Sequence, residues 1–289
     1  MTKILVTGAT GSLGRQTLNF LLKRVSPAQI ATLARDPAKL ADLAARGVDV
    51  RQGDYHDRAS LEATFKGIDR LFFISAPSFT NMVEQHRNIV AAATAAGVPH
   101  IVYTGIQRRE GSGFVMDQVT ATENATEEML AASGAGITVL RNATYMDALP
   151  FLLGPKALNE IRVPAGKGAS AFVARRDLGE ASAVVLSTEG HIGKTYTLTG
   201  GVAVTMDEIA AILSQIAGHT VRYTDVSVAT FIEERVAAGL PEPVGVFLAS
   251  WMQAIAAGEF ATVSGDLERL IGHPAVTPAA LLPTLFATA

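Results

Sequence analysis

Three glycines near the start of the chain, Gly8, Gly11 and Gly14, stand three residues apart, directly after a short apolar run and before a helix-forming stretch. Glycines at such places allow a tight turn, a close approach of the backbone to a pyrophosphate, and close packing of helix on strand. The start of the helix then faces the negative charge. The pattern predicts a dinucleotide-binding loop made of Gly8, Ala9, Thr10, Gly11, Ser12, Leu13 and Gly14.

The end of the next apolar run indicates which dinucleotide this would be. An NAD enzyme usually offers a carboxylate to the ribose 2′-hydroxyl there, whereas an NADP enzyme offers an arginine to the 2′-phosphate. The run ends in Arg35, and Asp36 precedes Pro37, which predicts that Asp36 caps the following helix. Lys39 adds positive charge nearby. We therefore expect NADP(H), while the alternative that Arg35 and Lys39 are ordinary solvated charges stays open.

These residues need a sheet to position them, and the first half of the chain predicts one. Six continuously apolar, β-rich runs alternate with helical stretches as far as Tyr145, which is typical of a parallel sheet covered on both faces. Beyond that point the alternation weakens. We expect an α/β fold, a Rossmann-like doubly wound parallel sheet with a smaller, mainly helical C-terminal lobe. Residues 1–145, with returning segments near 172–200, would bind NADP, and residues 146–289 would form the substrate-binding lobe.

In such a sheet, ligands bind outside the carboxyl ends of the strands. Two further strand ends are therefore candidates for cofactor contacts. The end of the third run would flank the adenine and the end of the fourth would line the middle of the cofactor; the residues are Asp54, Tyr55, Ser75, Ala76 and Pro77. Plain turn chemistry is the competing explanation for each of them.

Composition removes several classes of function. Hydrophobic residues make up 48% and charged residues 18% of the 289 residues, with a formal net charge of −3, so neither nucleic acid nor a membrane surface is an expected partner. The chain has no cysteine and its six histidines lack ligand-like spacing, so we expect no metal. No apolar run approaches the roughly 20 residues of a membrane helix, and the start is too short for a signal-peptide core, which predicts a cytoplasmic protein.

Several stretches resemble a known family. TGATGSLG is similar to the Thr-Gly-x-x-Gly-x-x-Gly loop of the short-chain dehydrogenase/reductase superfamily. The stretches QIATLARDPAKLADLAARGVDVRQGDYHD, QHRNIVAAATAAGVPHIVYTG, ITVLRNATY and DLERLIGHP resemble its atypical NmrA-like branch, in particular the NAD(P)H quinone oxidoreductase type 2 and triphenylmethane reductase group. The resemblance implies an NADPH-dependent oxidoreductase that transfers hydride to a quinone or similar electron-poor aromatic. The alternatives are a triarylmethane dye reductase and a non-catalytic redox sensor that binds NADP(H).

The resemblance also shows what is missing. Most short-chain dehydrogenases use a tyrosine with a lysine four residues later to protonate a carbonyl oxygen, and no tyrosine here has that partner. NmrA-like relatives often have a histidine where this chain has Glu123, so the resemblance assigns no proton donor at this position. Glu123 and Glu127 lie four residues apart on one helical face, and we expect a solvated face, with a functional carboxylate pair as the alternative. No catalytic residue is assigned.

Hydride transfer to a quinone or a cationic dye needs little acid from the enzyme, because the cofactor supplies the hard chemistry. The chain then has only to position an electron-poor ring. Asn142, as a further cofactor contact, and Tyr145 follow the sixth run, and Gln107 follows the fifth; we expect Tyr145 and Gln107 to contact the substrate. The expected partner is a small aromatic or quinone molecule, and the sequence leaves the oligomeric state open, a homo-oligomer included.

Overall fold

The computed structural model describes residues 1–75 and 81–287. The chain forms two compact units. Unit 1 consists of Met1–Ile106, Asp117–Arg141 and Arg175–Tyr196, and unit 2 of Gln107–Met116, Asn142–Ala174 and Thr197–Ala289. The segment between the fifth strand and the following helix therefore clusters with unit 2.

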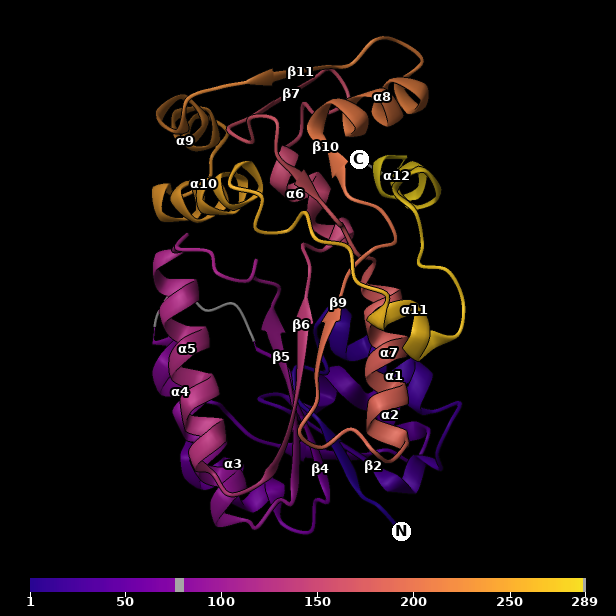
Figure 1. The fold of residues 1–289 in the computed structure, drawn as a ribbon. Coiled ribbons are helices and arrows are strands. Elements are labelled where there is room, and N and C mark those ends of the chain that lie inside the picture. Colours follow the sequence, from indigo (N-terminus) through magenta and orange to yellow (C-terminus); the bar gives the residue numbers. More distant parts are fainter. Residues whose placement is uncertain (76–80, 288–289) are drawn as a thin grey trace. The chain divides into compact units, whose positions relative to one another are not determined.

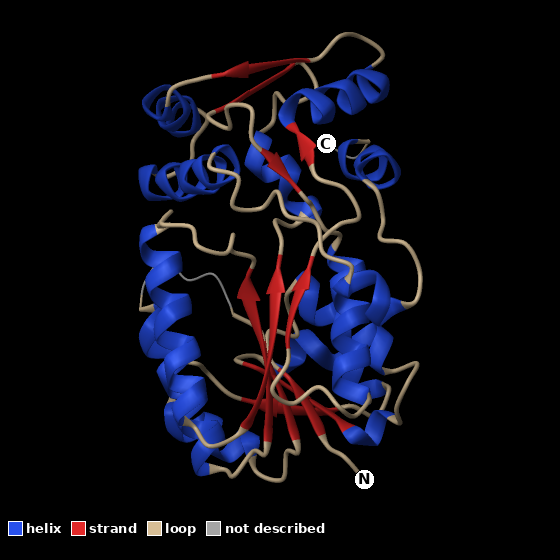
Figure 2. Cartoon of the chain, viewed as in Figure 1, coloured by secondary structure: helices blue, strands red, loops and turns tan. Residues whose placement is uncertain are grey.

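A seven-stranded sheet organises unit 1. Its strands are β1 (Ile4–Val6), β2 (Ile30–Ala34), β3 (Asp49–Gln52), β4 (Arg70–Phe73), β5 (His100–Ile106), β6 (Gly136–Asn142) and β9 (Thr195–Leu198). The spatial order is β3-β2-β1-β4-β5-β6-β9, and the strands run in parallel (Figure 2). β1 pairs with β2 through Ile4 and Ile30 and with β4 through Ile4 and Arg70, so the strand order reverses direction at β1. The expected Rossmann-like doubly wound sheet is confirmed, and the reversal marks the place where such sheets bind ligands.

Helices cover both faces of this sheet (Figure 1). They are α1 (Ser12–Leu21), α2 (Ala41–Ala45), α3 (Arg58–Phe65), α4 (Met82–Ala95), α5 (Asp117–Ala132) and α7 (Arg175–Ser187), with short 3-10 turns η1 (Pro27–Gln29) and η2 (Pro37–Leu40). α3, α4 and α5 lie on one face and α1 and α7 on the other. Gly179 of α7 approaches the backbone of α1 so closely that a Cβ would lie 2.8 Å from Thr17 N. The pair of helices therefore depends on that glycine.

An apolar cluster of buried side chains lies under the α3–α5 face. It includes Leu5, Leu71, Phe73 and Tyr103 from the strands and Phe65 and Ile89 from the helices, all fully buried. Because these strands are buried on both faces, they read as continuous apolar runs, and this explains why the alternation was visible in the sequence.

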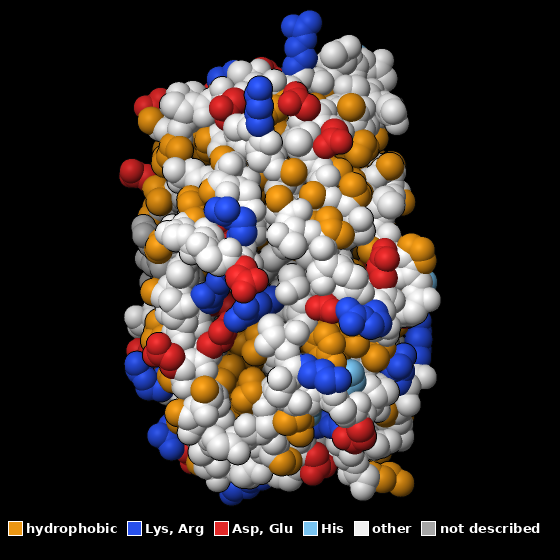
Figure 3. Space-filling model, in the orientation of Figure 1, with side chains coloured by type: hydrophobic (Ala, Val, Ile, Leu, Met, Phe, Trp, Pro, Cys, Tyr) orange, Lys and Arg blue, Asp and Glu red, His pale blue; other side chains and the backbone are white. Residues whose placement is uncertain are grey.

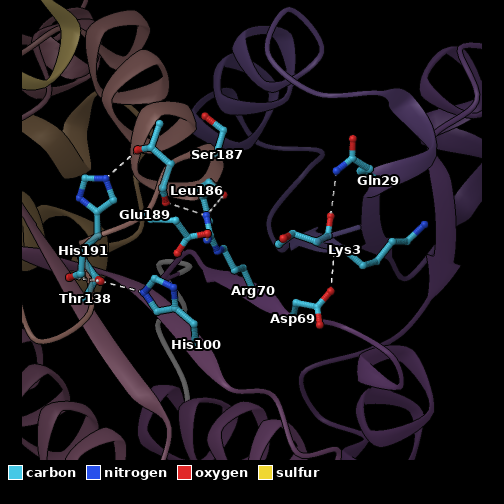
Figure 4. A network of polar contacts seen from close by, with 12 residues as sticks. Lys3, Gln29, Asp69, Arg70, His100, Thr138, Leu186, Ser187, Glu189 and His191 are labelled. Carbon is cyan, nitrogen blue, oxygen red and sulfur yellow. Dashed lines mark hydrogen bonds and ion pairs between the residues drawn. The ribbon is translucent and has the colours of Figure 1, made fainter.

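A polar network ties the last turn of α7 to the starts of β4, β5 and β6 (Figure 4). Arg70 donates from Nη1 to the carbonyl oxygens of Leu186 and Thr188, at 2.8 and 2.7 Å, and its Nη2 pairs with Glu189. His100 Nε2 lies 2.8 Å from Thr138 Oγ1. A cation at the C-terminal carbonyls of a helix satisfies acceptors that the helix itself leaves open and complements its dipole.

Unit 2 is mainly helical, as expected. Its helices are α6 (Leu149–Leu153), α8 (Met206–Ala217), α9 (Val228–Ala237), α10 (Glu242–Ala256), α11 (Asp266–Ile271) and α12 (Pro278–Phe286), with the short turn η3 (Met146–Ala148). Two small sheets join them: β7 (Glu160–Val163) with β11 (Arg222–Asp225), and β8 (Ala169–Ser170) with β10 (Val204–Thr205). Trp251 stacks on Phe260, with ring centroids 5.5 Å apart.

Candidate functional site

The glycine loop between β1 and α1 has the geometry of a tight turn. Gly8 has a φ of +61°, and its carbonyl oxygen accepts a hydrogen bond from Gly11 N at 2.9 Å. A Cβ on Gly14 would lie 2.3 Å from that carbonyl oxygen, whereas a Cβ on Gly11 would lie 3.2 Å from it. Gly8 and Gly14 are therefore required by the backbone itself. The space beside Gly11 is tight but not closed, so the demand for glycine there comes from elsewhere.

The N-terminus of α1 is open to an anion. Gly11 is the N-cap residue, so no N-cap side chain accepts a hydrogen bond from the first turn, and the first turn has no acidic residue. The first amides of a helix need acceptors, and the helix dipole favours a negative one. Thr7 fixes the loop from behind, because its Oγ1 donates to Phe72 O and accepts from Ile74 N at 2.9 Å. The loop thus presents backbone donors on a rigid base.

The end of β2 is arranged as the sequence predicts. Asp36 is the N-cap of η2 and accepts a hydrogen bond from Ala38 N at 3.1 Å, so its carboxylate is engaged with the chain's own backbone. Arg35 and Lys39 are exposed on either side of it. The backbone oxygen of Arg35 accepts from Gln52 Nε2 at 3.3 Å, which ties the residue to β3. Two cations are therefore available to a ligand at a position where the nearest carboxylate is occupied.

Two predicted cofactor contacts follow β3: Asp54, which belongs to a turn, and Tyr55, whose hydroxyl is buried. Asp54 accepts a hydrogen bond from His56 N at 3.0 Å, which is ordinary turn chemistry. Tyr55 is different: its hydroxyl is buried close to Thr7 and Gly8, but it makes no hydrogen bond of good geometry with a described residue. Burial raises the pKa of Tyr55 to about 12. A buried, unpartnered hydroxyl next to the glycine loop suits a ligand that supplies the missing partner.

The end of β4 holds only part of the predicted site. Ser75 donates from its backbone N to Thr104 Oγ1 at 2.9 Å, and its hydroxyl lies 3.3 Å from His86 Nε2. Ala76 and Pro77, which the sequence also predicts as cofactor contacts, lie outside the described residues. Ser75 is thus anchored from two sides.

From Ser75, a chain of hydrogen-bonded polar side chains continues within unit 1 to α5. His86 Nδ1 lies 2.7 Å from Thr126 Oγ1, and that hydroxyl donates to Thr122 O at 2.6 Å. The proton between His86 and Thr126 therefore belongs to Nδ1, and Nε2 accepts from Ser75. Burial lowers the pKa of His86 to about 4, which is consistent with a neutral ring. Sequence reasoning did not select His86; a histidine on a mostly apolar helix face gave no sign of this role.

Glu123 and Glu127 do not lie on the solvated helix face that the sequence led us to expect. Glu123 is 3% exposed, its Oε1 accepts from Tyr103 Oη at 2.7 Å and its Oε2 accepts from Ile106 N at 3.2 Å. Glu127 is half-buried and pairs with Arg141 at 3.0 Å. The expected solvated face is therefore wrong, because this side of α5 packs against β5 and β6. Each carboxylate has its own partner.

The predicted substrate residues come together within unit 2. Gln107 N donates to Asn142 O at 2.9 Å, and Asn142 Nδ2 lies 3.1 Å from Tyr145 Oη. Gln107 Nε2 donates to Thr262 O at 2.7 Å. The other amide atoms, Gln107 Oε1 and Asn142 Oδ1, are buried and have no partner among the described residues. Buried polar atoms are normally hydrogen-bonded, so this pair of acceptors suits a ligand with donor groups.

Within residues 1–75 and 81–287, no group of three or more His, Asp or Glu side chains could hold a metal ion. Over the same ranges, no helix is long and apolar enough to cross a membrane. On the face of the molecule in Figure 3, lysine and arginine side chains alternate with aspartate and glutamate.

Comparison with known proteins identifies the family. The profile of the NmrA-like family matches residues 1–273. The chain belongs to the NmrA-like family. Quinone oxidoreductase 2 of Escherichia coli is 38% identical over 288 residues, which is 98% of each chain. The structure of the Escherichia coli NADPH-dependent quinone oxidoreductase complexed with NADPH is similar with a TM-score of 0.90 at 37% identity, over 98% of this chain and 99% of that one. The Citrobacter sp. triphenylmethane reductase complexed with NADP(H) gives a TM-score of 0.89 at 37% identity, over 97% and 99%.

The resemblance inferred from the sequence motifs is thereby confirmed.

Within this NmrA-like protein, the chemistry of Tyr103 departs from the usual short-chain dehydrogenase tyrosine. Burial, and next the Glu123 carboxylate, raise the pKa of Tyr103 above its ordinary value, whereas a neighbouring lysine would lower it. Tyr103 therefore keeps its proton and is a poor acid.

Proposed function

We propose that this NmrA-like protein is an NADPH-dependent reductase that transfers hydride to a quinone or a similar electron-poor aromatic molecule. The observation that carries the choice of cofactor is the engagement of Asp36 with Ala38 N, next to exposed Arg35 and Lys39. A free carboxylate there would accept from a ribose hydroxyl and repel a phosphate. A capped one leaves the two cations to act on a 2′-phosphate.

The residues present fit the dinucleotide. Backbone amides of the loop and of the α1 N-terminus would hold the pyrophosphate, and the buried Tyr55 hydroxyl would gain a partner. The proposed contacts are Gly8, Ala9, Thr10, Gly11, Ser12, Leu13, Gly14, Arg35, Lys39, Asp54, Tyr55, Ser75, Ala76, Pro77 and Asn142. NADPH would supply the hydride. The protein's part is to bind, to orient and to exclude water.

On the substrate side, we propose that Gln107 and Tyr145 contact the acceptor. Gln107 Oε1 is a buried acceptor held in place because its Nε2 is bound to Thr262 O. Such an atom favours a ligand that carries a hydroxyl, as a reduced quinone does. Dinucleotide binding by residues 1–145 with the returning segments near 172–200, substrate binding by residues 146–289 and a cytoplasmic location remain part of the proposal, and the oligomeric state, a homo-oligomer included, stays open.

The buried polar side chains of Tyr103, Glu123 and His86 favour one class of reaction. Tyr103 and Glu123 are buried against each other, and His86 has both ring nitrogens engaged. This arrangement suits acceptors that need little proton transfer from the enzyme, because hydride addition to a quinone gives a stabilised phenolate that water can protonate. The 38% identity to quinone oxidoreductase 2 over 98% of both chains supports the same class.

The test is a set of NADPH oxidation assays with 1,4-benzoquinone, with a triarylmethane dye and without acceptor, together with an NADPH binding titration. Turnover with the quinone supports the proposal. Turnover with the dye alone would make the protein a dye reductase. Tight NADPH binding without turnover across a wide acceptor panel would make it a redox sensor and overturn the enzymatic proposal.

A further inference from the structure

A third cation reaches the end of β2 from a different element. Arg15 lies in the first turn of α1, directly after Gly14. Its Nη2 donates to the backbone oxygen of Lys39 at 3.1 Å. Lys39 belongs to η2, the turn that Asp36 caps. Arg15 therefore connects the segment proposed to hold the pyrophosphate with the segment proposed to hold the 2′-phosphate.

The contacts of Arg15 define its direction. Besides Lys39 O, its guanidinium makes two hydrogen bonds to the Asp42 carboxylate, from Nη1 to Oδ2 at 2.5 Å and from Nη2 to Oδ1 at 3.0 Å. The side chain of Arg15 is 30% exposed and that of Asp42 is 59% exposed. Held between α1 and α2, the guanidinium stays close to the backbone of the turn while one side of it remains open to solvent.

The end of β2 is surrounded by more cationic than anionic side chains. The cations at this edge are Arg15, Arg35 and Lys39, and the carboxylates are Asp36 and Asp42. Asp36 is bound to the backbone, so Asp42 is the carboxylate that directly neutralises a cation. A phosphate carries up to two negative charges and three acceptor oxygens, and arginine binds it with the same planar fork that it offers to a carboxylate.

We propose that Arg15 is a contact for the 2′-phosphate of NADPH and that Asp42 holds Arg15 in position and competes with the phosphate for it. This inference rests on the proposed NADPH site and adds a selectivity residue outside the β2 end. The two members of the ion pair then have opposite effects. Removing Arg15 weakens binding of a 2′-phosphorylated nucleotide, whereas neutralising Asp42 leaves that binding intact or strengthens it.

The experiment measures the binding of NADPH and NADH, and of adenosine 2′,5′-bisphosphate and AMP, to the whole protein by calorimetry at one salt concentration. Arg15→Ala is expected to lower affinity for both 2′-phosphorylated ligands about tenfold, with the ligands lacking that phosphate changed less than about twofold. Asp42→Asn is expected to raise affinity for the phosphorylated ligands or leave it unchanged. Arg58→Ala is the matched control, because Arg58 is also an exposed arginine paired with a carboxylate, Glu62, in the same unit.

Three results would overturn the inference: parallel losses for both kinds of ligand in Arg15→Ala, no loss in that variant, or a loss in Asp42→Asn as large as that in Arg15→Ala. The last result would mean that the ion pair only supports the fold of the turn. Thermal melts of each variant identify misfolding, and Arg15→Lys, which keeps the charge, serves as a second variant with partial loss expected. A wild-type protein that binds NADH as well as NADPH would instead overturn the proposed cofactor preference, which separates the two failures.

Discussion

Tyr103 Oη donates a 2.7 Å hydrogen bond to Glu123 Oε1, and both side chains are buried. The second carboxylate oxygen accepts from Ile106 N at the end of β5. Glu123 therefore links the middle of β5, the end of β5 and α5. Because both carboxylate oxygens accept hydrogen bonds from the chain itself, we expect Glu123 to hold these elements together rather than to donate a proton.

We expect Glu123→Gln to act on stability more than on turnover. The amide of glutamine can still accept from Tyr103 but faces Ile106 N with a donor, so the free energy of unfolding should fall by about 1–3 kcal/mol. Turnover should stay within about tenfold, because general acid–base catalysis contributes 10²–10⁴ when it operates. The matched variant Glu127→Gln loses a half-exposed ion pair with Arg141 and should cost less than about 1 kcal/mol.

Denaturant titrations and steady-state assays with 1,4-benzoquinone check both variants. A hundredfold or larger fall in kcat in either one, with NADPH binding intact, would show that it supplies a catalytic acid.

The glycine loop allows a prediction that separates folding from binding. Gly11→Val should fold, because a Cβ there only crowds Gly8 O at 3.2 Å, but should lose dinucleotide binding as the side chain occupies the place of the pyrophosphate. Gly14→Ala should instead destabilise the fold, since its Cβ would lie 2.3 Å from the same oxygen. Circular dichroism melts and NADPH titrations distinguish these outcomes. Unchanged NADPH affinity in a folded Gly11→Val protein contradicts the binding role of the loop.

Arg70 and Glu189 form an ion pair at the end of α7, and we expect them to contribute unequally to stability. Arg70→Ala removes the donor from two carbonyl oxygens at the end of α7 and should lower the free energy of unfolding by about 2–3 kcal/mol. Glu189→Gln should change it by less than about 0.5 kcal/mol, because the Glu189 side chain is 87% exposed. Urea denaturation measures both. Equal losses of unfolding free energy in the two variants would mean that Arg70 stabilises the protein through its ion pair with Glu189 and not through its hydrogen bonds to the end of α7.

Buried histidines predict the pH dependence of stability. Burial lowers the pKa of His86 and of His100 from 6.5 to about 4, so between these values the unfolded chain binds more protons than the folded one. The free energy of unfolding should therefore fall as the pH falls from about 6.5 to about 4, by an amount of order 2–3 kcal/mol per histidine at the lower end. His86→Gln should flatten this slope, whereas the exposed His219→Gln should leave it unchanged. An identical slope in all three proteins would refute the assignment.

Local patterns made parts of this molecule predictable. The cap at Asp36 follows from an aspartate before Pro37, and the sheet follows from strands that are apolar on both faces. The burial of Glu123 was not predictable in the same way. It depends on which face of α5 packs against β5, and a helix with few apolar residues gives no periodic signal of that face.

Contacts between segments that lie far apart in the sequence could not be predicted either. The approach of Arg15 to Lys39 O requires the register between α1 and η2, and the pairing of β7 with β11 joins residues about 60 positions apart, such as Ile161 and Tyr223. Neither segment alone has a composition that indicates its partner. Sequence reasoning therefore located the ends of the strands but not the side chains that cross between elements.

Arg35 is exposed at the end of β2, where the proposed site would hold the 2′-phosphate, so its substitution tests the preference for NADPH over NADH. If its guanidinium binds the 2′-phosphate, the contact is a charge-assisted hydrogen bond worth about 1.5–3 kcal/mol, and NADPH affinity should fall about 10- to 150-fold in Arg35→Ala. Because Arg35 is exposed and Lys39 keeps some positive charge nearby, we expect the lower end of that range. NADH lacks the phosphate, so its affinity should change little. Arg35→Asp should go further, since a carboxylate repels NADPH and offers the ribose hydroxyl an acceptor.

Wild type, Arg35→Ala and Arg35→Asp are titrated with both cofactors at one fixed salt concentration, because exposed charge contacts weaken with ionic strength. Parallel losses for NADPH and NADH would mean that Arg35 only shapes the adenosine pocket. No loss for either would mean that Arg35 is a solvated surface charge. In that case selectivity would have to come from Arg15 and Lys39, the other cations at this edge, and the pair Arg15→Ala and Asp42→Asn would then show whether Arg15 alone supplies it.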